Sequence, residues 1–336
     1  MTSVRVYVVT FRRPLLLERA LRSLIAQTHC EWTAEVLNDD PSDIRAAQVI
    51  QRLADPRIVL SQPSIHRGGT GNFNYAFRRV PEPLASILED DNWWEPAFLS
   101  TMVSALERFP DVQVACGNER IWQEQEDGTW RDTKNNIWPI TASETLFHSN
   151  PLDKCGQARL CNSSLLFRTA NALEWQTPAE IPIDVTEHFR ERVVPHPILL
   201  VNQPLVNYAE TLVTHRSKDP GIWASYQILL VGSVFTLASE HDRPAIAEAL
   251  WHRARTTEPQ FATSLLATGK LTPAAIDLWK LGRLREKARF AAGAIRHLKT
   301  TRALLSTRSK HDVIWAWLLR GNFANSLLPS GSNAHT

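Results

Sequence analysis

The chain has 336 residues, of which 43% are hydrophobic and 21% are charged, and it contains four cysteines. Because about 150 residues make an average domain, this length predicts two domains, or one large domain with an appendage. The composition excludes a disordered, collagen-like or polytopic membrane protein. The cysteines lack the spacing of zinc knuckles, so we expect free thiols of a cytosolic protein.

The net charge of +2 is unevenly distributed. Residues 268–320 contain twelve Lys or Arg and three Asp or Glu, a net charge of +9, which leaves −7 for residues 1–267. This asymmetry predicts an anionic partner of the C-terminal part, either a membrane surface or nucleic acid. We expect no export signal at the N-terminus, and a buried or interfacial helix rather than a transmembrane one over the apolar residues 222–239.

The first third of the chain alternates between expected strands and helices, and Pro14 begins the first helix. The expected strands are residues 4–10, 32–37, 57–60, 85–88 and 112–116, and the expected helices are residues 14–25, 43–53, 72–77 and 96–109. Such βα alternation predicts an α/β fold with a mostly parallel, Rossmann-like sheet covered on both faces.

The pattern changes after Cys116. An Asp127-Gly128 turn predicts a small antiparallel insertion, a hairpin of residues 121–125 and 129–131. The next expected elements are a strand over 160–167, a helix over 186–193, two short strands around Pro204, and helices over 245–255, 273–284 and 286–299. We therefore expect a first domain over 1–218 with halves meeting near 117, a helical basic region over 219–329, and a disordered tail over 330–336.

Several common site motifs are absent from the sequence. There is no Gly-x-x-x-x-Gly-Lys-Ser/Thr loop, and Gly68-Gly69-Thr70-Gly71 has neither the place nor the spacing of a dinucleotide-binding loop. His-Glu-x-x-His and Gly-x-Ser-x-Gly are missing as well, which removes the local signatures of zinc proteases and α/β-hydrolases.

Acidic side chains instead follow two of the expected strands. Glu89-Asp90-Asp91-Asn92 comes directly after residues 85–88, and Asn38-Asp39-Asp40 ends the second strand. Ligands of parallel sheets bind at the carboxyl edge of the strands. Clustered carboxylates there suit Mg²⁺ or Mn²⁺ shared with substrate phosphates. The alternatives are a solvated acidic turn for the first cluster and an ordinary turn for the second.

Together these segments resemble family 2 inverting glycosyltransferases of the GT-A fold. The similarity rests on Val8 to Pro14, on the helix ending in Gln27-Thr28, on Val36 to Asp43, and on Leu88-Glu89-Asp90-Asp91-Asn92-Trp93-Trp94-Glu95-Pro96. Order and spacing agree across about 220 residues.

The resemblance implies a role for each matching position on the donor side. By it, Asp39 contacts the donor base, and the strand end of Val9, Thr10 and Phe11 forms the rest of that pocket. Asp90 lies near the donor ribose. Asp91 is the main protein ligand of a Mn²⁺ or Mg²⁺ that bridges the diphosphate.

Three basic residues are further candidates at the diphosphate. His215 falls where related enzymes place a loop over the donor phosphates, as a metal ligand or a phosphate contact, and Arg13 and Arg67 would contact the diphosphate. For each, the alternative is a structural or surface role. Asn38 stands where the family commonly has Asp, which leaves the donor base undetermined, although UDP or dTDP is favoured.

The resemblance also implies a general base late in the α/β domain, in an acidic motif that ends in Arg. Asp184 and Arg190 have that spacing, so Asp184 is the candidate base and Glu187, one turn along, is the reserve. Ile183 stands where the family often has Glu. The alternative is that Asp184 only caps the following helix.

The chain has twelve tryptophans. Trp93, Trp94, Trp122, Trp130 and Trp138 would suit a saccharide acceptor, but most are expected in the core. In the C-terminal part, seven basic residues alternate with apolar ones in a pattern typical of membrane-surface helices, or of a solvated helix packed on the catalytic domain. Residues 313–320 form an apolar, Trp-bearing segment that fits an interface or a homodimer contact.

The sequence therefore predicts an inverting, metal-dependent hexosyltransferase-like enzyme, cytoplasmic or peripheral on the inner face of the cell membrane. It would move a sugar from a nucleoside diphosphate sugar to a hydroxyl of a glycan or lipid-linked acceptor, in surface polysaccharide biosynthesis, with no nucleic acid partner. The alternatives are a catalytically silent module that binds sugar nucleotides or glycans, and a nucleotidyltransferase.

Overall fold

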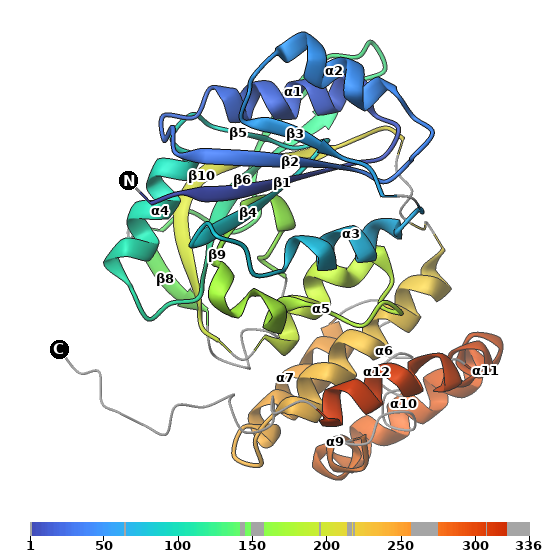
Figure 1. Cartoon of the computed structure of the whole chain (residues 1–336). Helices are drawn as coiled ribbons and strands as arrows, with labels where there is room; N and C mark the ends of the chain where they lie inside the picture. The colour runs from blue at the N-terminus through green and yellow to red at the C-terminus, as the bar shows by residue number, and fades with distance from the viewer. Residues whose placement is uncertain are drawn as a thin grey trace. The chain divides into compact units, whose positions relative to one another are not determined.

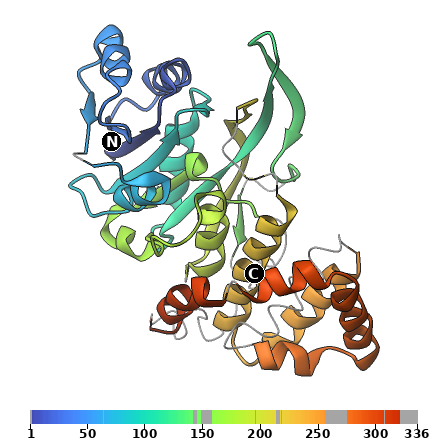
Figure 2. The same cartoon turned by 90° about the vertical axis from the view of Figure 1, so that its right-hand side faces the viewer.

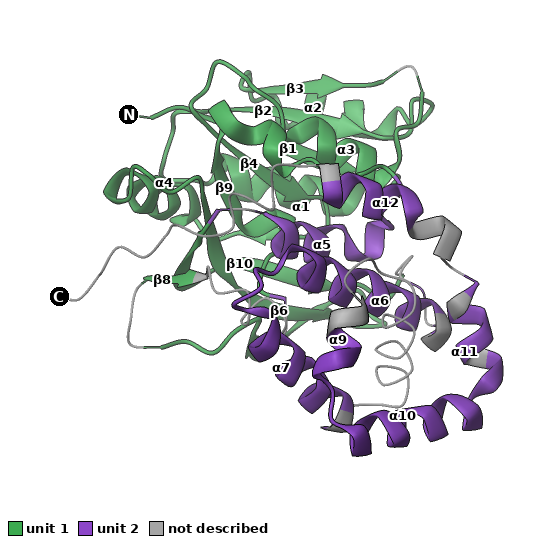
Figure 3. Cartoon of the chain, turned by 90° about the horizontal axis from the view of Figure 1, so that it is seen from below, with its two compact units in different colours: residues 1–148, 159–179, 197–215 green, residues 149–158, 180–196, 216–336 purple. Residues whose placement is uncertain are grey.

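A computed structural model describes residues 2–63, 65–141, 145–148, 158–194, 196–213, 217, 219–256, 275–306 and 308–320. Contacts within the chain divide it into two compact units (Figure 3). The first comprises residues 1–148, 159–179 and 197–215, and the second comprises residues 149–158, 180–196 and 216–336. The expected boundary at residue 218 stays a prediction, but residues 180–196 are grouped with the C-terminal helices.

The first unit is built on a mixed sheet of ten described strands in the order β3-β2-β1-β4-β9-β6-β10-β5, with β7 beside β6 and β8 beside β10 (Figure 1). The strands are β1 Val4–Thr10, β2 Trp32–Asn38, β3 Ile58–Ser61, β4 Leu84–Glu89, β5 Trp93–Trp94, β6 Val114–Glu124, β7 Trp130–Asn136, β8 Thr145–His148, β9 Leu165–Arg168 and β10 Ile198–Glu210. β1 to β4 are parallel, and β9 runs antiparallel to β4 and β6. The predicted α/β fold, with its antiparallel insertion, is confirmed.

Helices cover both faces of this sheet. They are α1 Pro14–Ile25, α2 Arg45–Leu53, α3 Gly68–Ala76 and α4 Phe98–Arg108. Val4, Val6 and Val8 of β1 share one core with α1, α2 and α4. On the opposite face of β1, the Tyr7 ring meets the Tyr75 ring of α3 at 6.4 Å between centroids. The period-two alternation of β1 thus separates two packed layers.

Two expected elements differ from those observed. Residues 112–116 and 121–125 belong largely to one long strand, β6, which forms a two-stranded ribbon with β7 (Figure 2). The two strands expected around Pro204 are one strand, β10, whose pairing with β6 shifts register on either side of Pro204. Because proline has no N–H, the ladder is interrupted there, and the bulge lets the strand continue.

The second unit is helical among its described residues. Its helices are α5 Thr186–Val193, α6 Pro220–Leu237, α7 Arg243–Thr256, α9 Ala275–Leu281, α10 Leu284–Arg296, α11 Leu298–Leu305 and α12 Arg308–Arg320. One core joins α6, α7, α9 and α10 through side chains such as Phe235, Trp251 and Phe290. Another joins α5, α6 and α12 through Phe189 and Trp315. Within the described ranges, no helix has the length and hydrophobicity to cross a bilayer.

Candidate active site

The predicted acidic clusters lie at the same edge of the sheet. β2, β1 and β4 are neighbouring parallel strands, with Thr10 opposite Asn38 and Val9 opposite Glu89. The turns that follow these residues therefore leave the sheet side by side at its carboxyl edge. This is the position expected for a ligand site in a parallel sheet.

Asp90 is buried at this edge and bound to the end of β1. Its Oδ2 accepts hydrogen bonds from Thr10 Oγ1 at 2.8 Å and from the Phe11 backbone N–H at 3.4 Å. The Asp90 backbone N–H donates in turn to the Val9 carbonyl at 3.0 Å. Burial, and then the Asp91 charge, raise the pKa of Asp90 to about 7. The residues predicted to share a donor pocket are thus brought together.

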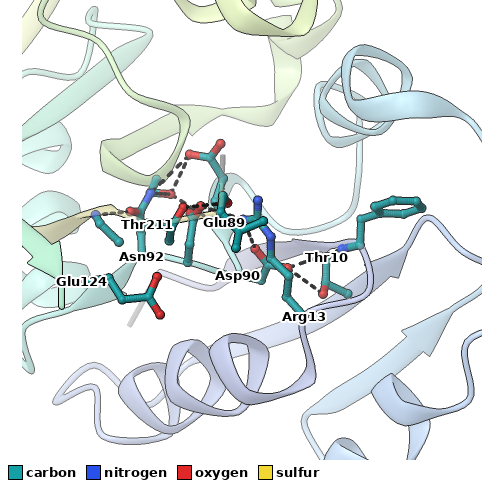
Figure 4. A network of polar contacts seen from close by, with 12 residues as sticks. Thr10, Arg13, Glu89, Asp90, Asn92, Glu124 and Thr211 are labelled. Carbon is teal, nitrogen blue, oxygen red and sulfur yellow. Dashed lines mark hydrogen bonds and ion pairs between the residues drawn. The ribbon is translucent and has the colours of Figure 1, made fainter. Parts of the chain in front are cut away.

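Asp91, in contrast, has a side chain that is 23% exposed. Arg13 Nη1 lies 2.8 Å from Asp91 Oδ2 and 3.4 Å from Asp90 Oδ1, so one guanidinium faces both carboxylates. Figure 4 shows Arg13 beside Asp90. Burial alone would lower the pKa of Arg13, but the two carboxylates raise it above its ordinary value. An accessible carboxylate on a turn fixed by hydrogen bonds fits the donor set of a divalent metal.

Asp39 directly follows β2 and binds the segment that enters α3. The Arg67 backbone N–H donates to Asp39 Oδ1 at 2.8 Å, and His66 Nδ1 lies 3.0 Å from Asp39 Oδ2. The His66 ring meets the Phe11 ring at 5.5 Å between centroids. Asp39, Phe11 and His66 thus form a group with one carboxylate and two flat rings. The guanidinium of Arg67 lies 4.1 Å from the Tyr75 ring centroid.

Glu89 and Asn92 complete the acidic turn, and their contacts were not predicted. Ser163 Oγ donates to Glu89 Oε2 at 3.0 Å, and Asn92 Nδ2 donates to Ser163 Oγ at 2.9 Å. Figure 4 shows Glu89 and Asn92 in this network of polar contacts. Asn92 Oδ1 accepts the Ala209 backbone N–H at 2.9 Å. These bonds join the turn to segments about 70 and 117 residues away, and no local pattern could indicate them.

A guanidinium stacked between two indoles supports the same turn. Arg19 of α1 lies 4.0 Å from the Trp93 ring centroid and 4.1 Å from that of Trp130. Its Nη2 donates to the Asp91 carbonyl at 2.6 Å. Burial lowers the pKa of Arg19 to about 10. The centroids of the Trp122 and Trp93 rings lie 5.5 Å apart, so three of the five tryptophans considered for a saccharide acceptor lie close together. The other two, Trp94 and Trp138, are buried, as expected of core residues.

The candidate base belongs to the second unit. Asp184 Oδ2 accepts a hydrogen bond from the Tyr226 hydroxyl at 3.3 Å and lies 3.5 Å from the Ser217 backbone N. Burial, followed by the Asp184 charge, raises the pKa of Tyr226. Val185 is the N-cap of α5, and no side-chain capping bond is present, which contradicts the alternative of Asp184 as a cap. Glu187 lies in the first turn of α5, and His215 lies outside the described residues.

Comparison with known proteins identifies the first part of the chain. Residues 5–167 match the family model of glycosyl transferase family 2. The S. aureus TarS 1–349 structure in complex with UDP superimposes with a TM-score of 0.61 at 13% identity, covering 93% of this chain and 92% of that one. Residues 5–167 thus belong to glycosyl transferase family 2, and the chain has a GT-A fold.

Two curated relatives cover less of the molecule. The putative colanic acid biosynthesis glycosyl transferase WcaA of Escherichia coli is 26% identical over 121 residues, which span 36% of this chain and 43% of the relative. Protein CgeD of Bacillus subtilis is 26% identical over 132 residues, which span 37% and 31%. The chain thus matches less than half the length of these relatives.

The family 2 match contains the donor-side candidates that precede residue 167, and only His215 falls after it. Asp39, Asp90 and Asp91 all fall within residues 5–167, as do Arg13 and Arg67. Asp184 and Glu187 follow the matched region. The match therefore places the acidic sheet edge inside the family 2 domain, and the candidate base beyond it.

Proposed function

We propose that this protein is an inverting, metal-dependent glycosyltransferase of surface polysaccharide biosynthesis. It would transfer one sugar, of the hexose type, from a nucleoside diphosphate donor to a hydroxyl of a glycan or a lipid-linked acceptor. The observation that carries the proposal is the grouping of Asp39, Asp90 and Asp91 at one carboxyl edge inside the family 2 domain. The relation to a colanic acid glycosyl transferase supports the polysaccharide setting.

In this proposal the donor base lies beside Asp39 and Phe11, and the ribose lies near Asp90. Val9 and Thr10 hold the end of β1 in place, since Thr10 and the Val9 carbonyl both bind Asp90. UDP or dTDP is the favoured donor nucleotide. Solved structures of TarS, which shares this fold, hold UDP and UDP-GlcNAc.

The diphosphate would lie toward Asp91, with Arg13 beside it and with Arg67 and His215 as further contacts. Asp91 would hold Mn²⁺ or Mg²⁺, with His215 as a second candidate ligand. When bound, such an ion neutralises the charge that develops on the departing diphosphate. Arg13, already 2.8 Å from Asp91, is placed to add a second positive charge, and fixed charges of this kind stabilise a transition state without reorganisation.

Transfer with inversion requires one base. Asp184 would accept the proton of the acceptor hydroxyl as its oxygen bonds to the sugar C1 and the C1 to diphosphate oxygen bond breaks, with Glu187 in reserve. The Tyr226 hydroxyl, 3.3 Å from Asp184 Oδ2, would orient this carboxylate.

The proposal also covers the organisation and location of the protein. The catalytic domain would comprise residues 1–218. The protein would be cytoplasmic, bound peripherally to the membrane, and a homodimer.

The test measures thermal stabilisation by UDP, GDP, dTDP and CDP, each with and without Mn²⁺, since a ligand that binds only the folded state raises its stability. We expect a Mn²⁺-dependent shift with one nucleotide, absent in Asp91→Asn. Asp127→Asn, which removes a carboxylate from the β6–β7 turn, is the matched control and should keep the shift. No shift with any nucleotide would overturn the proposal in favour of a catalytically silent module that binds glycans.

A further inference from the structure

α10 (Leu284–Arg296) presents an apolar stripe to solvent. Phe290 is its buried anchor in the core with Trp251. On the side away from Phe290, four apolar residues recur at the spacing of one helix face: Leu284, Ala288, Ala291 and Ile295. All four are exposed, Leu284 by 84% and Ile295 by 74%. A stripe of this length would normally pack against a core.

A second stripe of exposed arginines runs beside the first. Arg285, Arg289 and Arg296 lie one position further along the helix than the apolar residues, and so about 100° around it. Within the described ranges, no carboxylate lies at ion-pair distance from any of the three guanidinium groups. α11 continues the same character with exposed Leu298, Lys299 and Arg302. This surface combines apolar side chains with arginines that no described carboxylate pairs.

The apolar stripe and the arginine stripe together favour one kind of partner. Nucleic acid would be held by the arginines alone and would leave leucine and isoleucine in water. A bilayer with anionic headgroups satisfies both stripes, because a helix in its plane inserts the apolar residues while flanking arginines reach the phosphates. The net charge of +9 over residues 268–320 adds to the attraction.

We propose that the exposed face of α10, continued by α11, is a docking surface for an anionic lipid bilayer. This inference rests on the peripheral membrane location in the proposed function and on no other part of it. It names the surface of the protein that would contact the membrane. Binding would occur with α10 in the membrane plane and without substrate. The catalytic unit would thereby be held near lipid-linked acceptors.

The test measures flotation of the full chain with phosphatidylcholine vesicles that contain or lack phosphatidylglycerol. Arg285→Gln, Arg289→Gln and Arg296→Gln are combined in one variant. We expect the wild type to float only with the anionic vesicles, and the triple variant to bind roughly 100-fold more weakly, since each basic residue near such a surface contributes about fivefold. The matched control combines Arg22→Gln, Arg45→Gln and Arg52→Gln, exposed positions on α1 and α2, and should float like the wild type.

A second variant, Leu284→Ser with Ile295→Ser, tests the apolar stripe. It should keep its melting temperature, because both side chains are exposed, and lose the part of vesicle binding that resists high salt. Equal loss in the two triple variants would reduce the effect to net charge and overturn the proposal. Absence of flotation, or a gel shift with RNA in its place, would also overturn it. Nucleotide-dependent stabilisation, measured separately, tests the proposed donor site whatever the vesicle result.

Discussion

Arg13 Nη1 lies 2.8 Å from Asp91 Oδ2, so the carboxylate proposed to hold the metal is already neutralised by a side chain of the same domain. The same guanidinium lies 3.4 Å from Asp90. A divalent cation arriving alone would compete with Arg13 for Asp91. A cation arriving with a diphosphate would not, because the phosphate oxygens offer Arg13 another anionic partner.

Arg13→Gln should therefore separate metal binding from nucleotide binding. We expect the variant to bind Mn²⁺ alone about tenfold more tightly, and UDP with Mn²⁺ about tenfold more weakly, magnitudes typical of one charged hydrogen bond. Electron paramagnetic resonance of free Mn²⁺ and calorimetry measure the two affinities. Arg5→Gln, which removes the pair with Glu82 at the other end of β1, is the control. Unchanged Mn²⁺ affinity in Arg13→Gln would show that Arg13 does not compete with the metal.

Asp90 should make the stability of the protein fall as pH rises. Its pKa is raised to about 7, first by burial and then by Asp91, so between about pH 4 and pH 7 the folded state binds more protons than the unfolded state. Stability is then lost as pH rises through this window, by up to about 1.4 kcal/mol per pH unit, and stays low above it.

Asp90→Asn removes this titration but keeps an oxygen for Thr10 and Phe11. We expect its free energy of unfolding at pH 8 to equal or exceed that of the wild type, with a flatter pH dependence, while nucleotide binding falls. Urea titrations across the window measure this. If the variant were less stable than the wild type at pH 8, and its free energy of unfolding changed with pH as in the wild type, the buried Asp90 carboxylate would not destabilise the fold as expected.

The parts of the site that follow from the sequence are those set by local pattern and parallel topology. Apolar strands that are followed by Asp39 and by Asp90-Asp91 must bring those residues to one edge once β1 lies between β2 and β4. The arrangement of Ser163 and Arg19 was not predictable in this way. Ser163 is 74 residues from Glu89, and Arg19 meets its tryptophans only after α1 packs on the sheet.

Arg19 should stabilise the Asp91 turn rather than bind substrate. Arg19→Met retains the apolar stem but loses the hydrogen bond to the Asp91 carbonyl and the stacking on Trp93 and Trp130. We expect a loss of about 1–2 kcal/mol in the free energy of unfolding, measured by urea denaturation followed by tryptophan fluorescence. Arg22→Met on the same helix removes only an exposed pair with Glu18 and should leave the free energy of unfolding nearly unchanged. Equal effects of the two substitutions would assign Arg19 no special role.

Asp184 should be required for transfer and not for donor binding. Asp184→Asn keeps the shape of the side chain and an acceptor for the Tyr226 hydroxyl, but it cannot take the acceptor proton. We expect the transfer rate to fall by about 10²–10⁴, with thermal stabilisation by nucleotide and Mn²⁺ unchanged. Glu187→Gln, in the first turn of the same helix, is the matched comparison, and a selective loss there would move the base to Glu187. Transfer unchanged in both variants would place the base elsewhere in the chain.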